Sequence, residues 1–214
     1  MPTRPDIAAI RTDYRQGSLD EVSENPIKQF DTWFQEAVKG EVMAVNAMSL
    51  STIKEGRPAN RIVLLKDFTE EGFVFFTNYQ SHKGEEIAAN PHVALTFWWA
   101  ELERQVRIEG VATKVSAEES EEYFQSRPRG SRIGAWASPQ SHPIAGREIL
   151  EARVQELQQQ YGGEVEIPRP EYWGGYRVAP DFLEFWQGRS SRLHDRLAYT
   201  LQPDGAWLIQ RLAP

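Results

Sequence analysis

Cysteine is absent from the 214-residue sequence. Its absence excludes structural disulfides, thiolate zinc sites and cysteine nucleophiles. Proteins of reducing compartments do without disulfides, and residues 1–17 hold no apolar run of the kind that a secretory signal carries. No stretch approaches the ~20 consecutive apolar residues of a membrane-spanning helix. We therefore expect a cytoplasmic protein that does not enter a membrane.

Positive charge is also in short supply, because 24 Lys and Arg stand against 31 Asp and Glu, a net charge of −7 at pH 7. The phosphate backbone of a nucleic acid repels a chain this acidic. The short motifs of dinucleotide-binding proteins, P-loop enzymes, zinc proteases and serine hydrolases are missing. The four histidines show no metal-ligand spacing. We expect no nucleic-acid partner and no metal.

The remaining composition is that of an ordinary globular chain, with 40% hydrophobic residues, 15 Gly and 13 Pro. At ~100–200 residues per domain, this length predicts one domain. Residues 1–24 are polar and mixed in charge, so we expect a flexible N-terminal arm there. We expect residues 25–214 to form a single domain with a helical elaboration at about 117–161.

The order of apolar segments predicts the fold class. Asn25-Pro26 is typical of a helix start, and Gly40 ends the helix. Short turns separate the strand-length segments that follow, which predicts antiparallel pairing. The expected strands cover residues 42–50, 59–66, 73–78, 92–100, 105–115, 176–178, 182–187 and 206–212, and further helices cover about 83–89, 117–127 and 145–161. The sequence therefore predicts a mainly β (α+β) fold, a small antiparallel barrel with peripheral helices.

Basic residues cluster at three places in this acidic chain: around 127–132, around 189–196, and at Lys66 with Lys83. Arginine binds phosphate in a bidentate manner, and a helix N-terminus adds backbone donors. Local basic sites of this kind suit a small phosphorylated ligand. Solvated surface ion pairs are the alternative interpretation, and both stay open at this point.

Two segments indicate where a phosphate would bind. Residues 77–83 place hydroxyl, amide and ammonium groups where a strand gives way to a helix, although Ser81 is equally suited to cap that helix. Tyr123, Arg127 and Ser131 follow at spacings of four, which would share one helix face if Pro128 did not intervene. A proline kink would still allow the three side chains to converge.

Several longer blocks together resemble one known family. They are RIVLLK (61–66), ERQVRIEG (103–110), YFQSRPRGSRIGAWAS (123–138), YWGGYRV (172–178), FWQG (185–188), RLHDR (192–196) and the terminal RLAP. In order and spacing the chain resembles, from about residue 25 onward, the FMN-binding split-barrel family of pyridoxine/pyridoxamine 5′-phosphate oxidases. The resemblance implies a homodimer with FMN at the subunit interface and an antiparallel split β-barrel fold.

The resemblance also implies the reaction. Enzymes of this family oxidise pyridoxine 5′-phosphate or pyridoxamine 5′-phosphate to pyridoxal 5′-phosphate. Dioxygen accepts the electrons and gives hydrogen peroxide, and the amine substrate also releases ammonia. No metal or protein nucleophile is needed, which agrees with the missing motifs.

The same resemblance implies the site residues. FMN would contact Arg61, Ile62, Val63, Leu64, Leu65, Lys66, Phe76, Thr77, His82, Lys83, Gln105, Gln140, Ser141, Trp186 and Arg196. His82 stands where the family commonly has Arg, so we expect that contact with the flavin phosphate to be weaker or pH-dependent.

The substrate phosphate would bind Lys66, Tyr123, Arg127 and Ser131. Arg192 and His194 are the implied catalytic residues; they would cover the substrate ring, orienting and polarising it. Arg11 and Tyr14 would belong to a mobile arm that closes over the site.

Two other functions are alternatives to the oxidase that the resemblance implies. A split-barrel flavin or deazaflavin reductase should lack the joint sets Tyr123/Arg127/Ser131 and Arg192/His194, which this chain has. A non-catalytic protein that binds flavin or pyridoxal phosphate is the other alternative, and the sequence leaves it open. Trp98 and Trp99 indicate an aromatic surface for a second subunit to cover, unless both are simply core residues.

Overall fold

The computed structural model describes residues 6–9, 12–163 and 165–214. The chain divides into two compact units. The terminal unit comprises Met1–Val45, Thr96–Ile108 and Phe182–Pro214. The central unit comprises Asn46–Leu95 and Glu109–Asp181.

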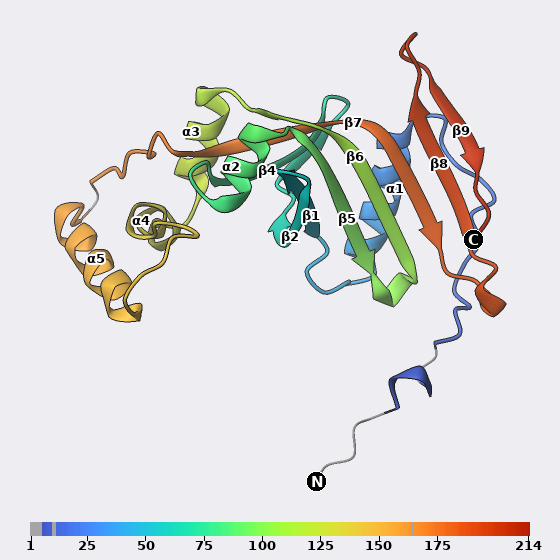
Figure 1. Ribbon diagram of the computed structural model, residues 1–214, viewed down its shortest axis with the longest axis horizontal. Helices are drawn as coiled ribbons and strands as arrows, with labels where there is room; N and C mark the ends of the chain where they lie inside the picture. The colour runs from blue at the N-terminus through green and yellow to red at the C-terminus, as the bar shows by residue number, and fades with distance from the viewer. Residues whose placement is uncertain (1–5, 10–11, 164) are drawn as a thin grey trace. The chain divides into compact units, whose positions relative to one another are not determined.

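The predicted fold class is confirmed, because the described residues form a nine-stranded, mainly antiparallel sheet together with five α-helices (Figure 1). Strand neighbours follow the order β2-β1-β5-β6-β7-β4-β3, with β8 on β7 and β9 on β8. The strands are β1 Ala47–Lys54, β2 Arg57–Leu64, β3 Asp67–Thr69, β4 Gly72–Asn78, β5 His92–Trp99, β6 Arg104–Lys114, β7 Trp173–Gln187, β8 Asp195–Leu201 and β9 Trp207–Arg211. The helices are α1 Pro26–Lys39, α2 His82–Ala89, α3 Ala117–Ser126, α4 Arg129–Ala137 and α5 Arg147–Gln160, with 3₁₀ turns η1 Ile7–Ala9, η2 Ala100–Leu102 and η3 Ser190–Arg192.

Helix α1 begins where the sequence predicts. The side chain of Asn25 accepts the N–H groups of Ile27 and Lys28, and Pro26 fills the first turn, where no N–H is needed. The buried face includes Phe30, whose ring lies 5.2 Å from that of Phe97 in the same unit. Val38, near the end of the helix, is exposed.

Strand β1 starts later than predicted. Val42 is irregular and residues 43–46 form turns instead of strand, and Glu41 and Ala44 have positive φ, which breaks an extended run. The hairpin from β1 to β2 turns at Glu55-Gly56, both with positive φ, and pairs Lys54 with Arg57. This turn geometry matches the right-handed twist of the flanking strands.

The expected strands at 176–178 and 182–187 are one continuous strand, β7, which changes partners along its length. Residues 173–178 pair with β4, and residues 182–187 pair with β8. At the change, an added Cβ on Gly72 would overlap the carbonyl oxygen of Val178, and one on Gly110 would overlap that of Ala179. Two glycines therefore allow the neighbouring strands to approach the β7 backbone closely.

Three elements of the described chain were not expected individually: the short strand β3, strand β8 and helix α4. Strand β8 forms the hairpin with β9 near the C-terminus (Figure 1). Helix α4 follows α3 after a break at Arg127-Pro128 and lies beside α5. The core of this helical part comprises Phe124, Ile133, Ala137, Leu157, Ile167 and Trp173. Of the helices in the described part of the chain, none combines the length and apolarity that crossing a membrane requires.

Candidate active site

A cavity of about 460 Å³ in the central unit contains most of the predicted binding residues of that unit. We call it the central cavity. All four residues expected to bind the substrate phosphate line it: Lys66, Tyr123, Arg127 and Ser131. Seven residues expected to contact FMN also line it: Ile62, Val63, Leu64, Phe76, Thr77, Lys83 and Gln140. Pro128 and Trp173 complete the lining, and the site prediction contained neither of them.

One wall of the central cavity is made of three nearly parallel aromatic rings. Tyr123 stacks on Phe76 at 3.9 Å between ring centroids, and Trp173 lies 5.6 Å from Phe76 with an angle of 14° between the planes. Phe76 on β4 pairs with Gly175, two residues along β7 from Trp173, while α3 carries Tyr123. Such a wall offers flat apolar surface to a ring-shaped ligand.

Arg127 is the most unusual residue of this cavity. Its guanidinium carbon lies 4.4 Å from the ring centroid of Trp173, and its Nη1 is buried with no hydrogen-bond partner among the described residues. Burial lowers the pKa of Arg127, although the nearby Tyr123 opposes this shift. A buried cationic donor without a partner is costly unless an acceptor, best an anion, binds to it.

The break between α3 and α4 places this arginine. Pro128 disfavours helical backbone at the residue before it, and Arg127 is extended, with φ −72° and ψ 148°. Helix α4 then starts at Arg129, so Ser131 lies in its first turn. The expectation that Tyr123, Arg127 and Ser131 converge despite the proline agrees with their shared cavity.

Polar groups gather at another part of the central cavity. The amide oxygen Oε1 of Gln140 accepts hydrogen bonds from Nζ of Lys83 at 3.0 Å and from Oγ1 of Thr77 at 3.2 Å. Ser81 is buried and caps α2 by accepting the N–H of Gly84, so the capping interpretation of Ser81 holds. A cation and a hydroxyl thus point at one oxygen position, which is the donor set that a phosphate oxygen needs.

The surroundings of Lys83 lower its pKa. Burial, and the positive charge of Arg61, lower the pKa of Lys83, while Glu86 opposes the shift. Nη2 of Arg61 lies 2.6 Å from Oε2 of Glu86. The remaining FMN residues predicted in this unit do not line the central cavity: Arg61, Leu65, His82 and Ser141.

A second cavity, of about 650 Å³, lies in the terminal unit, and we call it the terminal cavity. Tyr14, Arg192 and His194 line it together, as predicted for the groups around the substrate ring. The ring of Tyr14 lies 5.7 Å from His194 and 5.6 Å from Trp186. Arg11, the other arm residue of the prediction, lies outside the described residues.

His194 is arranged as a neutral hydrogen-bond donor. The N–H of Arg189 donates to Nδ1 at 3.1 Å, so the neutral ring carries its proton on Nε2. Burial, together with the positive charge of Arg192, lowers the pKa of His194. Ser191 and Arg192 both have positive φ, a strained backbone of the kind found at functional loops.

The other FMN residues predicted in the terminal unit are Gln105, Trp186 and Arg196. Gln105 is half-buried on β6, and Trp186 lies 4.6 Å from His194 between ring centroids. Arg196 makes a bidentate pair with the buried Glu184, which raises the pKa of Arg196. Glu184 also accepts from Arg107 at 2.9 Å. Sequence reasoning did not single out Glu184, although a carboxylate in an apolar strand is a signal for a buried ion pair.

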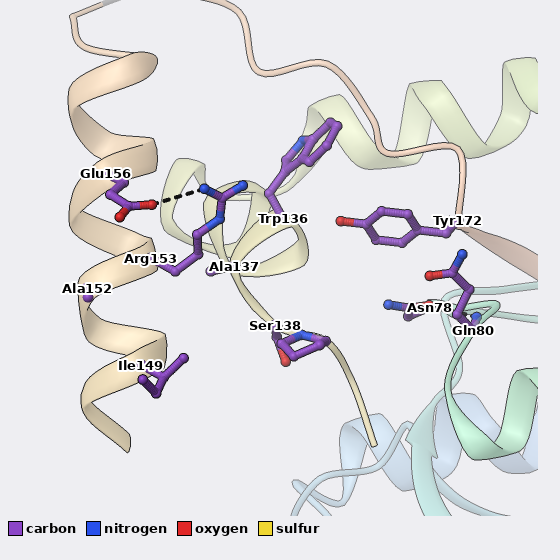
Figure 2. Close-up of a pocket in the computed structure, with 11 residues that line it drawn as sticks. Asn78, Gln80, Trp136, Ala137, Ser138, Ile149, Ala152, Arg153, Glu156 and Tyr172 are labelled. Atoms are coloured by element: carbon purple, nitrogen blue, oxygen red, sulfur yellow. Dashed lines mark hydrogen bonds and ion pairs between the residues drawn. The ribbon is translucent and has the colours of Figure 1, made fainter. Parts of the chain in front are cut away.

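A third cavity, of about 590 Å³, lies between α4, α5 and the end of β4 (Figure 2). None of the predicted site residues lines it. Its apolar walls include Trp136 and Tyr172, and its one arginine, Arg153, is paired with Glu156 at 3.0 Å. The paired charge and the absence of predicted residues separate this cavity from the candidate site.

Comparison with known proteins agrees with these observations. Residues 34–161 match the family model described as pyridoxamine 5′-phosphate oxidase. Residues 173–214 match a second model, described as the pyridoxine 5′-phosphate oxidase C-terminal dimerisation region.

Relatives are similar over nearly their whole length. The chain is 58% identical over 211 residues to a pyridoxine/pyridoxamine 5′-phosphate oxidase of Cyanothece sp., covering 97% of this chain and 98% of that one. It is 59% identical to pyridoxine/pyridoxamine 5′-phosphate oxidase 1 of Ralstonia nicotianae, covering 97% and 99%.

Two solved structures share the fold. PhzG from Burkholderia lata, in complex with tetrahydrophenazine-1-carboxylic acid, superposes with a TM-score of 0.86 at 29% identity, covering 92% of this chain and 100% of that one. An FMN-binding, pyridoxamine 5′-phosphate oxidase-related protein of Nostoc punctiforme gives a TM-score of 0.71 at 18% identity, covering 90% and 100%. The expected split-barrel fold is thereby confirmed. With family models that match residues 34–161 and 173–214, and relatives at 58% identity, the chain belongs to the pyridoxine/pyridoxamine 5′-phosphate oxidase family.

Proposed function

We propose that this protein is an FMN-dependent oxidase that converts pyridoxine 5′-phosphate or pyridoxamine 5′-phosphate to pyridoxal 5′-phosphate. Dioxygen is the electron acceptor, hydrogen peroxide is released, and the amine substrate also yields ammonia. The observation that carries the proposal is the buried Nη1 of Arg127, which has no hydrogen-bond partner among the described residues, in an aromatic-walled cavity with Lys66. Family membership at 58% identity supports the same reaction.

The residues of the central cavity fit a flavin mononucleotide. Lys83 and Thr77 already hold an oxygen acceptor, the amide of Gln140, in the position suited to a phosphate oxygen. Strand β2 exposes Ile62 and Leu64 at the cavity lining, where apolar side chains suit a flat ring. FMN is the cofactor, and when bound it takes two electrons from the substrate carbon and passes them to dioxygen.

The substrate phosphate binds to the other cationic group of this cavity. Arg127 supplies the buried donor, Lys66 a second cation, and Ser131 a hydroxyl in the first turn of α4. Binding at the phosphate, away from the reacting carbon, fixes the substrate ring in position, because an oriented substrate reacts without further loss of rotational freedom. Tyr123 supplies a ring face along that path.

Arg192 and His194 orient and polarise the substrate ring. The lowered pKa keeps His194 neutral near pH 7, and Nε2–H is then its donor. Arg192 adds a fixed positive charge at the terminal cavity. These groups bind and orient the substrate and exclude water from it. Tyr14 of the N-terminal arm, next to His194, covers the substrate together with them. No strong protein base is required, because the flavin supplies the redox chemistry.

The working enzyme is a homodimer with FMN at the subunit interface. The region that matches the dimerisation model, 173–214, also contains Trp186, Arg192, His194 and Arg196. Exposed apolar side chains support the same assembly, since Ile62 is 66% and Trp98 48% exposed, while Trp99 is core. We place the enzyme in the cytoplasm, acting on small phosphorylated substrates and not on nucleic acid, in keeping with its net charge of −7.

A peroxide-release assay tests the proposal. Purified protein loaded with FMN should release hydrogen peroxide with pyridoxine 5′-phosphate and with pyridoxamine 5′-phosphate, and ammonia only with the amine. Arg127→Ala should lose this activity at low substrate, whereas Arg147→Ala, a matched loss of an arginine whose side chain is 86% exposed, should keep it. A flavin-loaded protein that releases no peroxide with either vitamer would refute the proposal in favour of a binding protein or a reductase.

A further inference from the structure

We propose that Glu103 is a positioning residue for the N-terminal arm, holding the arm by its backbone so that Tyr14 lies beside Trp186 and His194. Every residue in this argument belongs to the terminal unit. The effect on turnover rests on the proposed function, but the placement of the arm does not.

Glu103 itself has an unusual setting. It ends the tight turn η2 between β5 and β6 with a left-handed backbone at φ 53°, and it is only 9% exposed. A buried carboxylate needs compensating donors. Its Oε2 accepts the backbone N–H of Arg15 at 2.7 Å and that of Gln16 at 2.9 Å. Its side chain therefore binds a segment 87 residues away in the sequence.

The backbone of the same residue fixes the loop that follows β7. The carbonyl oxygen of Glu103 accepts the N–H of Gly188 at 2.8 Å and Nε2 of Gln187 at 3.2 Å. Gln187 is 1% exposed, and its Oε1 accepts from Nε of Arg104 at 2.9 Å. Glu103 thus bonds both the arm and the end of β7 with the loop that follows it, which sets the spacing of the arm from Trp186 to Gly188.

The arm and the loop meet at close range. An added Cβ on Gly188 would lie 2.7 Å from Cγ of Tyr14, and one on Gly17 would lie 3.0 Å from the side chain of Gln187. Gly188 is therefore needed for this approach, whereas a Cβ at Gly17 would require only a small shift of the Gln187 side chain. Tyr14 then contacts Trp186 edge-on, with the ring planes at 90°.

A second anchor holds the arm further along the chain. Leu19 is 2% exposed, its N–H donates to Oδ2 of Asp195 at 3.2 Å, and its carbonyl accepts from Arg211 at 2.8 Å. This anchor would keep residue 19 in place without Glu103. What Glu103 adds is the position of residues 14–16, which include the one arm residue whose ring faces His194.

Backbone hydrogen exchange measured by mass spectrometry tests the placement without any substrate. In Glu103→Ala, peptides covering residues 12–18 should exchange about tenfold faster, the change that ~1.4 kcal/mol produces. Gln16→Pro removes one of the two donors from the arm itself and should have the same effect with Glu103 intact. Glu101→Gln, at an exposed carboxylate of the same turn, should leave exchange unchanged.

Steady-state kinetics give the functional readout. The Michaelis constant for pyridoxine 5′-phosphate should rise in Glu103→Ala and in Gln16→Pro, with a smaller change in turnover, and Glu103→Gln should recover part of the loss because it keeps one acceptor oxygen. Unchanged arm exchange in both variants would overturn the inference. So would faster exchange in β8 together with no effect of Gln16→Pro, because Glu103 would then be a purely structural residue. An oxidase that proved inactive would refute the proposed function and leave the exchange result standing.

Discussion

The guanidinium of Arg127 packs on the ring of Trp173, 4.4 Å from its centroid, with one nitrogen directed to no acceptor in the described structure. The ring stabilises the charge from one side without satisfying its N–H groups. The arginine is thereby held in place with donor capacity to spare. The arginine side chain is therefore already ordered for anion binding, so less conformational entropy is lost when an anion binds.

Arg127→Ala should raise the Michaelis constant for pyridoxine 5′-phosphate strongly. Losing a hydrogen bond to a charged group costs ~1.5–3 kcal/mol, or about one to two decades in apparent affinity. The unphosphorylated vitamin should be affected much less, because it lacks the group that Arg127 binds. Flavin content should stay near that of the wild type. If Arg127→Ala lost flavin and kept its substrate affinity, the two phosphate sites would have been assigned the wrong way round.

Lys83→Ala should weaken FMN binding, because Lys83 and Thr77 converge on one oxygen position. We expect a loss of about tenfold or more, as for one charge-assisted hydrogen bond. Quenching of flavin fluorescence on titration with apoprotein measures it. Lys54→Ala is the matched control, because Lys54 pairs with Glu85 near the surface and lines no part of the central cavity. Equal flavin affinity in the two variants would count against the assignment.

His194 should make the folded state less stable as the solution becomes more acidic. Its pKa is lowered in the fold, so below about 6.5, the ordinary value, the unfolded chain binds more protons than the folded one. The stability it contributes is complete above that value and is lost as pH falls through the folded pKa. Thermal unfolding between about pH 5 and pH 8 should show a smaller acid decline in His194→Gln than in the wild type. Parallel profiles would show that His194 is not the group responsible.

The dimer should depend on the exposed strand face of β2. Light scattering should give twice the chain mass of 24.5 kDa for the wild type. Ile62→Lys, at a side chain that is 66% exposed, should shift the protein toward monomer and lower its flavin content together. Val38→Lys, at an exposed apolar position on α1, should do neither. A monomeric wild type with full FMN occupancy would contradict the proposed interface.

Local signals in the sequence predicted much of the fold. Asn25 and Ser116 are side-chain caps that act within a few residues, so their helices start where expected. Helix α4 was not expected because Pro128, Gly130 and Gly134 are poor helix formers, and packing of Ile133 and Ala137 overrides them.

Strand β8 was not expected for a related reason. Its first residues continue a charged loop, and only Leu197 to Tyr199 are buried. The alternation typical of a half-buried strand is therefore missing from its sequence.

The residues of the candidate site were likewise predicted only in part. Resemblance predicted Arg127 and Ser131, because their motif is contiguous in the sequence. It did not single out Trp173, Glu103 or Glu184, whose roles come from contacts across the fold. Trp173 lies beside Phe76 because β4 and β7 pair in one register, and no local pattern encodes a register between segments about 100 residues apart.

Strand β7 lies so close to Gly72 and Gly110 that these two positions cannot accept a side chain. When all twenty residues are tried at each position and folded protein is selected, only glycine should be recovered. Any side chain there would overlap a backbone carbonyl of β7, which is held in place by the strand. Gly130 and Gly134 face open space in a helix, and alanine there should stabilise by ~0.5–1 kcal/mol. Gly72 and Gly110 are therefore required by the packing of the strands, whereas Gly130 and Gly134 are positions at which substitution can increase stability.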